Sequence, residues 1–202
     1  MSSRSRSVRL DASAVVRAAL AESRAPVVLV DGPSGAGKST FADAIVAAWP
    51  GVAPQLVRMD DLYPGWAGLE PASHQVVRDL LLPLRSSGVG HWRRWDWAAS
   101  RAGERRVARA GHPLVIEGCG CLTRASASLA DLRVWLNAAD DVRKRRALDR
   151  DRGAFDAHWD MWQRQWGRLV ARESPVSLAD LVFDTTAVLA APGAAARGTV
   201  SP

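Results

Sequence analysis

The stretch Asp31-Gly-Pro-Ser-Gly-Ala-Gly-Lys-Ser-Thr40 joins an apolar run, Ala25–Val30, to a segment with helical character, Ser39–Trp49. It fills every fixed position of the pattern G-x-x-x-x-G-K-[ST], which connects a strand to a helix. Glycines let the backbone N–H groups turn inward around phosphate oxygens, and the helix N-terminus adds positive potential. The sequence therefore predicts a phosphate-binding loop formed by Gly32, Pro33, Ser34, Gly35, Ala36, Gly37, Lys38, Ser39 and Thr40.

Two side chains of this loop add chemistry to that of its backbone. Lys38 would reach the β- and γ-phosphates, and the Ser39 hydroxyl would coordinate magnesium. We therefore expect ATP and Mg²⁺ as cofactors, with Lys38 as a catalytic group and Ser39 as a metal ligand. A glycine-rich turn without a ligand is the alternative, which the complete motif and its context disfavour.

Outside the loop, strands and helices are predicted to alternate. Four more apolar runs read as buried strands, at Val52–Met59, Pro113–Glu117, Leu132–Leu136 and Leu181–Phe183. Helices are predicted at Asp11–Ala21, Ser73–Leu82, Asp140–Arg150 and Phe155–Arg172. This alternation is typical of an α/β fold with a parallel sheet. Between these elements, Asp60–Leu69 reads as a loop, and Gly88–Glu104 is polar and tryptophan-rich without a clean period.

The length and composition suggest a single cytoplasmic domain. The chain has 202 residues, of which 1–9 are predicted as a flexible tail and 190–202 as a loose tail. No apolar run approaches the roughly 20 residues of a membrane-spanning helix, and the N-terminus lacks the apolar region of a secretory signal. Cys119 and Cys121 are too few for a disulfide scaffold and suit a reducing cytoplasm as small buried residues. We therefore expect no membrane association.

Positive charge is carried almost entirely by arginine, because Lys38 and Lys144 are the only lysines in a chain with a formal charge of +6. A basic balance can indicate a nucleic-acid partner. The arginines are scattered, however, with one dense run at Arg143–Arg152, which favours a local phosphate site. We therefore expect a small-molecule phosphate acceptor and no nucleic acid, and we leave homo-oligomerisation open.

Two acidic positions follow predicted strands. In Met59-Asp-Asp-Leu-Tyr63, Asp60 stands where a carboxylate could take the proton of an acceptor hydroxyl, and Asp61 could help to hold magnesium or cap a turn. Glu117 ends an apolar strand, where an acid holds magnesium directly or through water. The alternatives are a solvated acidic turn for the pair and a plain strand-end acid for Glu117.

The phosphate loop, the Asp-Asp-Leu-Tyr stretch, the Glu117-Gly118 pair and the arginine run together resemble the uridine kinase-like family of nucleoside and metabolite kinases, over about residues 27–184. The resemblance implies a three-layer P-loop kinase-like domain with a five-stranded parallel sheet of order 2-3-1-4-5 and a helical lid. It also implies ATP- and Mg-dependent transfer of the γ-phosphoryl group to a hydroxyl or phosphate of a nucleoside-like or other metabolite. In such kinases the acid at the position of Asp60 is the candidate base.

The segment 140–153 resembles the lid of such kinases, a mobile basic helix that closes over the triphosphate. Arg146 and Arg150 are four residues apart and share a helix face, so we assign them as catalytic. Arg143 lies on the same side and is expected to bind the cofactor. The face offers these arginines no equally spaced acids, and Arg152-Gly153 is a candidate hinge. A solvated, salt-bridged helix is the alternative.

For the acceptor, Trp95-Asp96-Trp97 stands where uridine kinases carry Tyr-Asp-Phe, so stacking on a flat substrate is implied. Ser100 replaces the histidine that follows in that family, which speaks against pyrimidine ribonucleoside specificity. The expected substrate-binding residues are Asp60, Tyr63, Trp66, Trp95 and Arg101.

A stripe of tryptophans at helical spacing is read either as core packing or as a wall of the acceptor pocket; it comprises Trp159, Trp162 and Trp166. A glutamine near the substrate is implied by the resemblance, and Gln163 and Gln165 are both candidates.

The alternative from another class is a P-loop NTPase or an ATP-binding regulatory module without a phosphoryl acceptor. A GTPase would show an N-K-x-D signature, whereas Asn137-Ala-Ala-Asp140 lacks the lysine. A mechanical ATPase would show an acidic pair at the end of the strand that carries Glu117, where this chain has Gly118.

Overall fold

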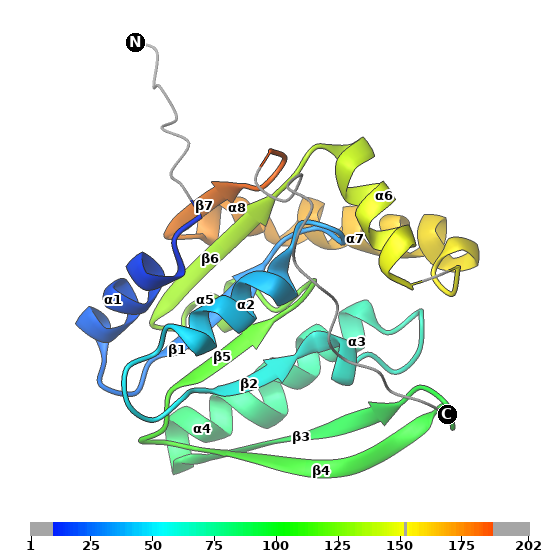
Figure 1. The fold of residues 1–202 in the computed structure, drawn as a ribbon. Helices are drawn as coiled ribbons and strands as arrows, with labels where there is room; N and C mark the ends of the chain where they lie inside the picture. The colour runs from blue at the N-terminus through cyan, green and yellow to red at the C-terminus, as the bar shows by residue number, and fades with distance from the viewer. Residues whose placement is uncertain (1–9, 152, 188–202) are drawn as a thin grey trace.

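A computed structural model describes residues 10–151 and 153–187. At its centre is a parallel sheet of order β2-β5-β1-β6-β7 (Figure 1). Its strands are β1 (Val27–Asp31), β2 (Gln55–Arg58), β5 (Leu114–Glu117), β6 (Leu132–Asn137) and β7 (Leu181–Asp184). With the separate hairpin left out of the count this is the expected order 2-3-1-4-5, so the predicted fold is confirmed. The tails predicted at 1–9 and 190–202 lie outside the described residues.

The sheet separates two hydrophobic clusters because successive side chains of a strand point to opposite faces. Val27 and Leu29 of β1 belong to one cluster, and Val28 and Val30 belong to the other. All five residues of β1 are buried, which is why this strand reads as a continuous apolar run.

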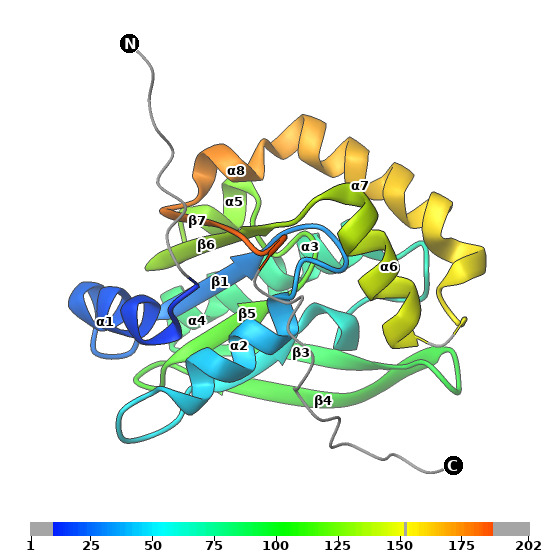
Figure 2. The same ribbon diagram turned by 45° about the horizontal axis from the view of Figure 1, so that its top comes forward.

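One cluster lies under α1 (Ala12–Glu22) and α2 (Lys38–Ala47), and the other under α3 (Leu69–Gln75) and α7 (Trp159–Glu173) (Figure 2). The result is the predicted three-layer arrangement. Asp11 caps α1 by accepting hydrogen bonds from the backbone N–H groups of Ser13 and Ala14, at 2.9 and 3.2 Å. Two short helices, α5 (Arg124–Ala127) and α8 (Pro175–Leu178), complete the α7 side of the molecule.

The helical segment after the Asp60–Leu69 loop is longer than the predicted Ser73–Leu82. It consists of α3, a π-helical turn η2 (Val76–Leu81) and α4 (Leu82–Ser87). Pro83 has no N–H group to donate to the preceding turn, which explains why the hydrogen-bond ladder changes its spacing just before it. Inside the predicted loop, Met59–Asp61 forms a 3₁₀ turn, η1.

The tryptophan-rich segment forms a β-hairpin that sequence reasoning did not predict, with strands β3 (Val89–Asp96) and β4 (Arg101–Arg109) (Figure 1). Only Gly90, Trp92 and Ala108 of these strands are buried, and the pairing register shifts between Arg93 and Trp95. A strand pair with few buried positions and an interrupted register shows no clean period of two in its sequence.

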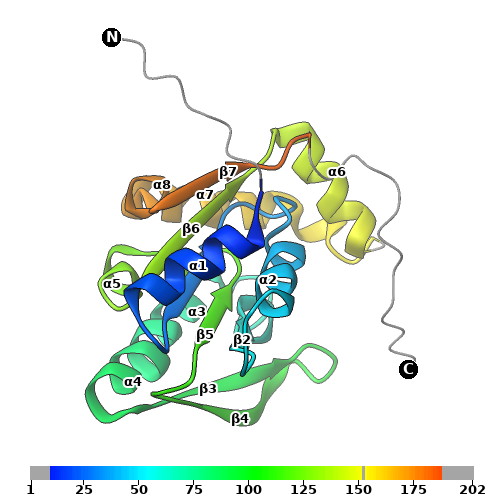
Figure 3. The same ribbon diagram turned by 60° about the vertical axis from the view of Figure 1, so that its left-hand side comes forward.

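The remaining elements are α6 (Asp140–Asp151) and the 3₁₀ turn η3 (Asp156–His158), which leads into α7. Helix α6 stands beside the phosphate loop at the carboxyl ends of the strands (Figure 3). This is the segment predicted to be the lid.

Candidate active site

The phosphate loop leaves the carboxyl end of β1 and enters α2, as its sequence predicts. Gly35 and Gly37 have φ angles of 80° and 86°, in the left-handed region that favours glycine. A Cβ atom on Gly35 would collide with the backbone carbonyl of Arg143 in α6. The loop therefore needs glycine both for its turn and for the close approach of α6.

Lys38 is the only lysine at this loop, and its residue is 7% exposed. Its Nζ donates to the carbonyl oxygen of Pro33 at 2.9 Å and lies 3.4 Å from the Cys119 Sγ. Burial by itself lowers the pKa of Lys38, but nearby acidic groups, Cys119 in its thiolate form and the carboxylates of Glu117 and Asp31, oppose it and the net pKa is raised. The ammonium group is therefore held charged where phosphates would lie.

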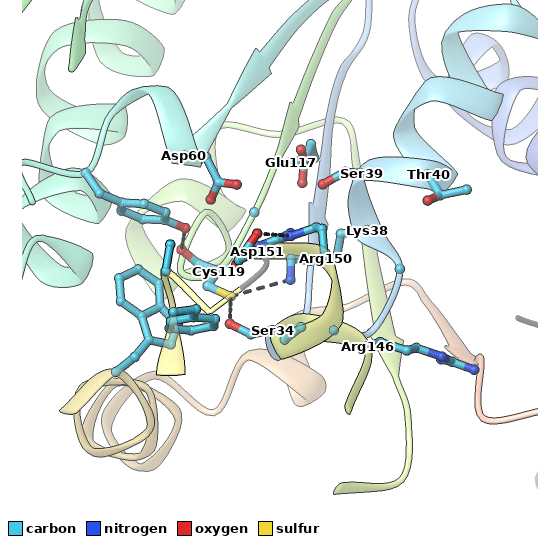
Figure 4. A pocket seen from close by; sticks show the side chains of 18 of the residues that line it. Ser34, Lys38, Ser39, Thr40, Asp60, Glu117, Cys119, Arg146, Arg150 and Asp151 are labelled. Carbon is cyan, nitrogen blue, oxygen red and sulfur yellow. Dashed lines mark hydrogen bonds and ion pairs between the residues drawn. The ribbon is translucent and has the colours of Figure 1, made fainter. Parts of the chain in front are cut away.

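Glu117 ends β5 and is 2% exposed. One of its oxygens accepts a hydrogen bond from the Arg58 guanidinium at 2.9 Å, a partner that sequence reasoning missed. Burial raises the pKa of Glu117, against the opposing effects of Lys38, Ser39 and Arg58. Figure 4 shows the Glu117 carboxylate and the Ser39 hydroxyl facing one another beside the loop.

These two oxygen-bearing groups fit a magnesium ion, which prefers hard oxygen ligands and keeps several waters or phosphate oxygens. No cluster of three or more His, Cys, Asp or Glu side chains able to hold a metal occurs in residues 10–151 and 153–187. The donor set therefore suits an ion that arrives with the nucleotide and completes its coordination with phosphate oxygens.

Asp31 is a second residue that sequence reasoning left without a role. Its fully buried carboxylate accepts hydrogen bonds from the backbone N–H groups of Gly32, Gly120 and Leu122, at 2.6, 3.0 and 2.7 Å. Burial raises its pKa to about 7, although these N–H groups and Lys38 favour the ionised form. Asp31 thus ties the phosphate loop to the segment that follows β5. An acid at the end of a buried strand is the signal that could have identified it.

Cys119 is buried, as predicted, but it also lines the candidate site. Its Sγ lies 3.5 Å from the Ser34 Oγ and 3.3 Å from the carbonyl oxygen of Gly32. Burial raises the pKa of this thiol, so it is neutral at physiological pH.

A cavity of about 570 Å³ joins the phosphate loop to the loop after β2 (Figure 4). Its charged and polar lining comes from Ser34, Lys38, Ser39, Thr40, Asp60, Glu117, Arg146, Arg150 and Asp151. The structure thus brings together residues that the sequence separates by more than 100 positions.

The two neighbouring acids after β2 point to different places. Asp60 lines the cavity, whereas an oxygen of Asp61 accepts from the Nε of Arg94 on the hairpin at 2.8 Å. This placement favours Asp60 over Asp61 for work on a substrate.

Part of the cavity lining is an aromatic wall, formed by Tyr63, Trp66, Trp97, Phe155 and Trp162. The Trp66 ring stacks on Phe155 with centroids 5.3 Å apart, and its centroid lies 5.0 Å from that of Trp97. The indole N–H of Trp97 donates to the carbonyl oxygen of Asp60 at 2.8 Å, and the Tyr63 hydroxyl donates to that of Cys119 at 2.9 Å. These hydrogen bonds connect the aromatic wall to the segment that carries Asp60 and to Cys119, which lies beside the phosphate loop.

Trp95 and Arg101, predicted as substrate contacts, do not line this cavity. Trp95 lies along a second cavity beside the hairpin, and Arg101 is exposed on β4. Strand β3 ends at Asp96, so Trp97 lies in the turn and its ring reaches Asp60. Sequence reasoning treated Trp95 and Trp97 as one aromatic platform because it missed the hairpin.

Arg146 and Arg150 line the cavity, whereas Arg143 does not. The expectation that these arginines are unpaired is wrong for two of the three, Arg143 and Arg150. Arg143 pairs with Asp140 at 2.7 Å and donates to the Gln163 side chain at 3.0 Å, and Arg150 pairs with Asp151 at 2.7 Å. Asp140 precedes Arg143 by three residues, and Asp151 follows Arg150 by one. These acids do not repeat the spacing of the arginines, so the sequence pattern did not reveal them.

The guanidinium of Arg146 extends away from Lys38 in Figure 4 and donates to the carbonyl oxygens of Thr185 and Thr186, at 3.2 and 3.1 Å. The candidate hinge is described only at Gly153, whose φ of 92° is in the left-handed region. Arg152 lies outside the described residues.

Both interpretations of the tryptophan stripe apply. Trp159, Trp162 and Trp166 are all buried in the core, and Trp162 also lines the cavity. Gln163 contacts Arg143, and the Gln165 side chain donates to the carbonyl oxygen of Trp66 at 2.9 Å. Neither glutamine lines the cavity.

The strand order, the lysine-bearing loop after β1 and the acid at the end of β5 define a three-layer α/β fold with a P-loop. The solved structures that share this fold include two whose names describe kinases. A possible uridine kinase from Bacillus stearothermophilus is 19% identical with a TM-score of 0.57, and the match covers 86% of this chain and 97% of that one. A protein provisionally assigned as a fructose transport system kinase, from Silicibacter sp. TM1040, is 19% identical with a TM-score of 0.54. That match covers 86% of this chain and 98% of the other.

At this level of identity the similarity establishes the fold. No protein-family model matches the sequence, and no curated protein matches it. Within residues 10–151 and 153–187, no helix combines the length and apolar character needed to cross a bilayer.

Proposed function

We propose that this protein is a phosphotransferase that moves the γ-phosphoryl group of ATP, with Mg²⁺, to a hydroxyl group of a small metabolite. One observation carries the proposal: the phosphate loop, Asp60 and the aromatic wall line one continuous cavity of about 570 Å³. Donor and acceptor can therefore lie in one space, as in-line transfer requires.

On the donor side, backbone N–H groups within Ser34–Thr40 bind the phosphates, and Lys38 exchanges its bond to Pro33 for phosphate oxygens. Ser39 and Glu117 would hold Mg²⁺, Glu117 directly or through water, and the bound ion would supply neutralisation of the charge on the phosphates. Arg150 exchanges its bond to Asp151, and Arg146 its bond to the Thr185 carbonyl oxygen, for contacts with the phosphoryl group. There the two guanidinium groups stabilise the negative charge that develops during transfer.

On the acceptor side, Asp60 accepts the proton of the attacking hydroxyl. The O–H bond of the acceptor breaks, a new bond forms between its oxygen and the γ-phosphorus, and the bond to the bridging oxygen breaks to release ADP. The aromatic wall supplies no positive charge for an acceptor phosphate, which favours a hydroxyl. Its faces suit the flat part of a nucleoside-like or other metabolite.

A P-loop NTPase or a regulatory module that only binds ATP remains the competing class. Such a protein needs the phosphate loop and Glu117 but has no use for a second half of the cavity. The aromatic wall beside Asp60 therefore favours an enzyme with a phosphoryl acceptor.

The proposal is tested by measuring ADP release from Mg·ATP, first alone and then with a panel of nucleosides, vitamin precursors and sugars. We expect slow release alone and a large acceleration with one class of alcohol. The same fast release with no acceptor, unchanged by every compound, would contradict the proposal. A Lys38→Ala variant identifies any contaminating kinase in the preparation.

A further inference from the structure

The hairpin bounds a second cavity, of about 480 Å³, between β3 and the π-helical turn η2. Its lining includes Arg78, Arg93, Arg94, Arg105, His91 and Trp95. Trp95 is the aromatic that sequence analysis singled out and that the candidate active site does not use. The two cavities have no lining residue in common.

The positive charge around this cavity is only partly compensated. Arg78 is bound through two hydrogen bonds to Asp79, at 2.6 and 2.7 Å, and Arg94 is bound to Asp61. Within the part of the chain that the structure describes, no carboxylate forms an ion pair with Arg93 or Arg105. Among the described residues, the Arg93 side chain makes a single hydrogen bond, a long one of 3.4 Å to the carbonyl oxygen of Gly103.

Arg93 and Arg105 stand directly opposite one another in the hairpin register. Directly opposed residues of an antiparallel pair place their side chains on the same face, and like charges in that position destabilise the sheet. The hairpin concentrates this cost, because residues 89–109 contain six arginines and two carboxylates. An anion bound between the two guanidinium groups would remove the repulsion.

The uncharged lining residues of the second cavity indicate which chemical group the bound anion carries. Trp95 is partly exposed and lines the cavity, two residues along the strand from Arg93. The Nδ1 atom of His91 is buried and lacks a hydrogen-bond partner within the described residues. We propose that this second cavity is a binding site for a small molecule that carries a phosphate group beside a flat ring, with the phosphate between Arg93 and Arg105 and the ring on Trp95.

The second cavity and the candidate active site are lined by adjacent residues of the turn after β2. Leu62 lines the second cavity and Tyr63 lines the first. The hairpin holds that turn through the Arg94–Asp61 ion pair and the Trp97 bond to the Asp60 carbonyl oxygen. A ligand beside Arg93 is therefore placed to influence Asp60, although its binding does not depend on the proposed catalytic activity.

Phenyl phosphate is the minimal probe, since it combines one dianionic phosphate with one flat ring. It is titrated into the full chain in the presence of Mg²⁺ and a saturating non-hydrolysable ATP analogue, so that the phosphate loop is filled. Binding is followed by the indole N–H resonance of Trp95, assigned with Trp95→Phe. We expect this resonance to shift, with a tighter Kd than for inorganic phosphate and no shift with benzyl alcohol.

Arg93→Gln and Arg105→Gln should each weaken binding by about tenfold, the scale of one charge-assisted hydrogen bond. Arg106→Gln is the matched control. Arg106 follows Arg105 on β4, but it pairs with Glu104 and does not line the cavity. It should bind as the unmodified chain does. An absent shift, or equal weakening by all three substitutions, overturns the site, and equal affinity for inorganic phosphate overturns the ring assignment.

Discussion

The donor half and the acceptor half of the cavity are built in different ways. The donor half consists mainly of backbone from one continuous stretch, Gly32–Thr40, with Lys38 and Glu117 buried beside it. The acceptor half consists of side chains from three separate segments: the turn after β2, the tip of the hairpin, and the η3–α7 region. The first can be recognised in ten residues, whereas the second exists only once the chain has folded.

This difference predicts how each half responds to substitution. Removing a group that stabilises the charge developing during transfer should lower the rate of transfer, whereas removing a ring that only holds the acceptor should raise the acceptor KM. The variants below range from the largest expected effect to the smallest.

Lys38→Ala should lower phosphoryl transfer by at least about 10³-fold, because it removes a preorganised positive charge from the phosphates. Lys144→Ala is the matched control, since Lys144 is the only other lysine and is exposed on α6. Both are measured by steady-state ADP release, with circular dichroism to check folding. Comparable activity in the two variants would argue against the nucleotide site.

Asp60→Asn keeps the shape of the side chain and removes its ability to accept a proton. We expect kcat to fall by about 10²–10³-fold, within the range for general acid–base groups, with little change in ATP affinity. Asp61→Asn should have a smaller effect, because Asp61 is engaged by Arg94. The reverse ranking would mean that the wrong acid of the pair has been assigned.

Arg150→Ala should slow single-turnover transfer by about 10²-fold while leaving ATP binding nearly unchanged, because its contact matters most as charge develops. Arg146→Ala should act in the same direction, and Arg145→Ala, on the exposed side of α6, serves as the control. Hydrogen exchange of residues 140–151 should slow when a non-hydrolysable ATP analogue binds. Unchanged kinetics together with unchanged exchange would make α6 a solvated helix and not a lid.

Trp66→Ala should raise the acceptor KM by about tenfold, the loss expected for one stacked ring, and leave the ATP KM unchanged. The ATP KM is the internal control, since the Trp66 ring packs against Trp97 and Phe155, which belong to the aromatic wall. A change in the ATP KM of similar size would show that the two halves are not separable.

The same contrast explains which parts of the site were predictable from sequence. The loop glycines and Lys38 follow from local sequence pattern, and the strand order was implied by the family resemblance. Placing Trp97, and not Trp95, beside Asp60 requires the end of β3, which no local period reveals. Asp31 and Arg58 act through partners more than 50 residues away, and the Arg143–Gln163 bond depends on how α6 meets α7.

The central claim is that one cavity holds both the phosphoryl donor and its acceptor. Once the panel has identified an accelerating alcohol, ³¹P NMR follows the γ-phosphoryl group of ATP during a reaction with the enzyme, Mg²⁺ and that alcohol. The account predicts that the γ signal is replaced by a phosphate ester of the alcohol in step with ADP. Conversion of the γ signal to inorganic phosphate alone would contradict it and make the protein an NTPase.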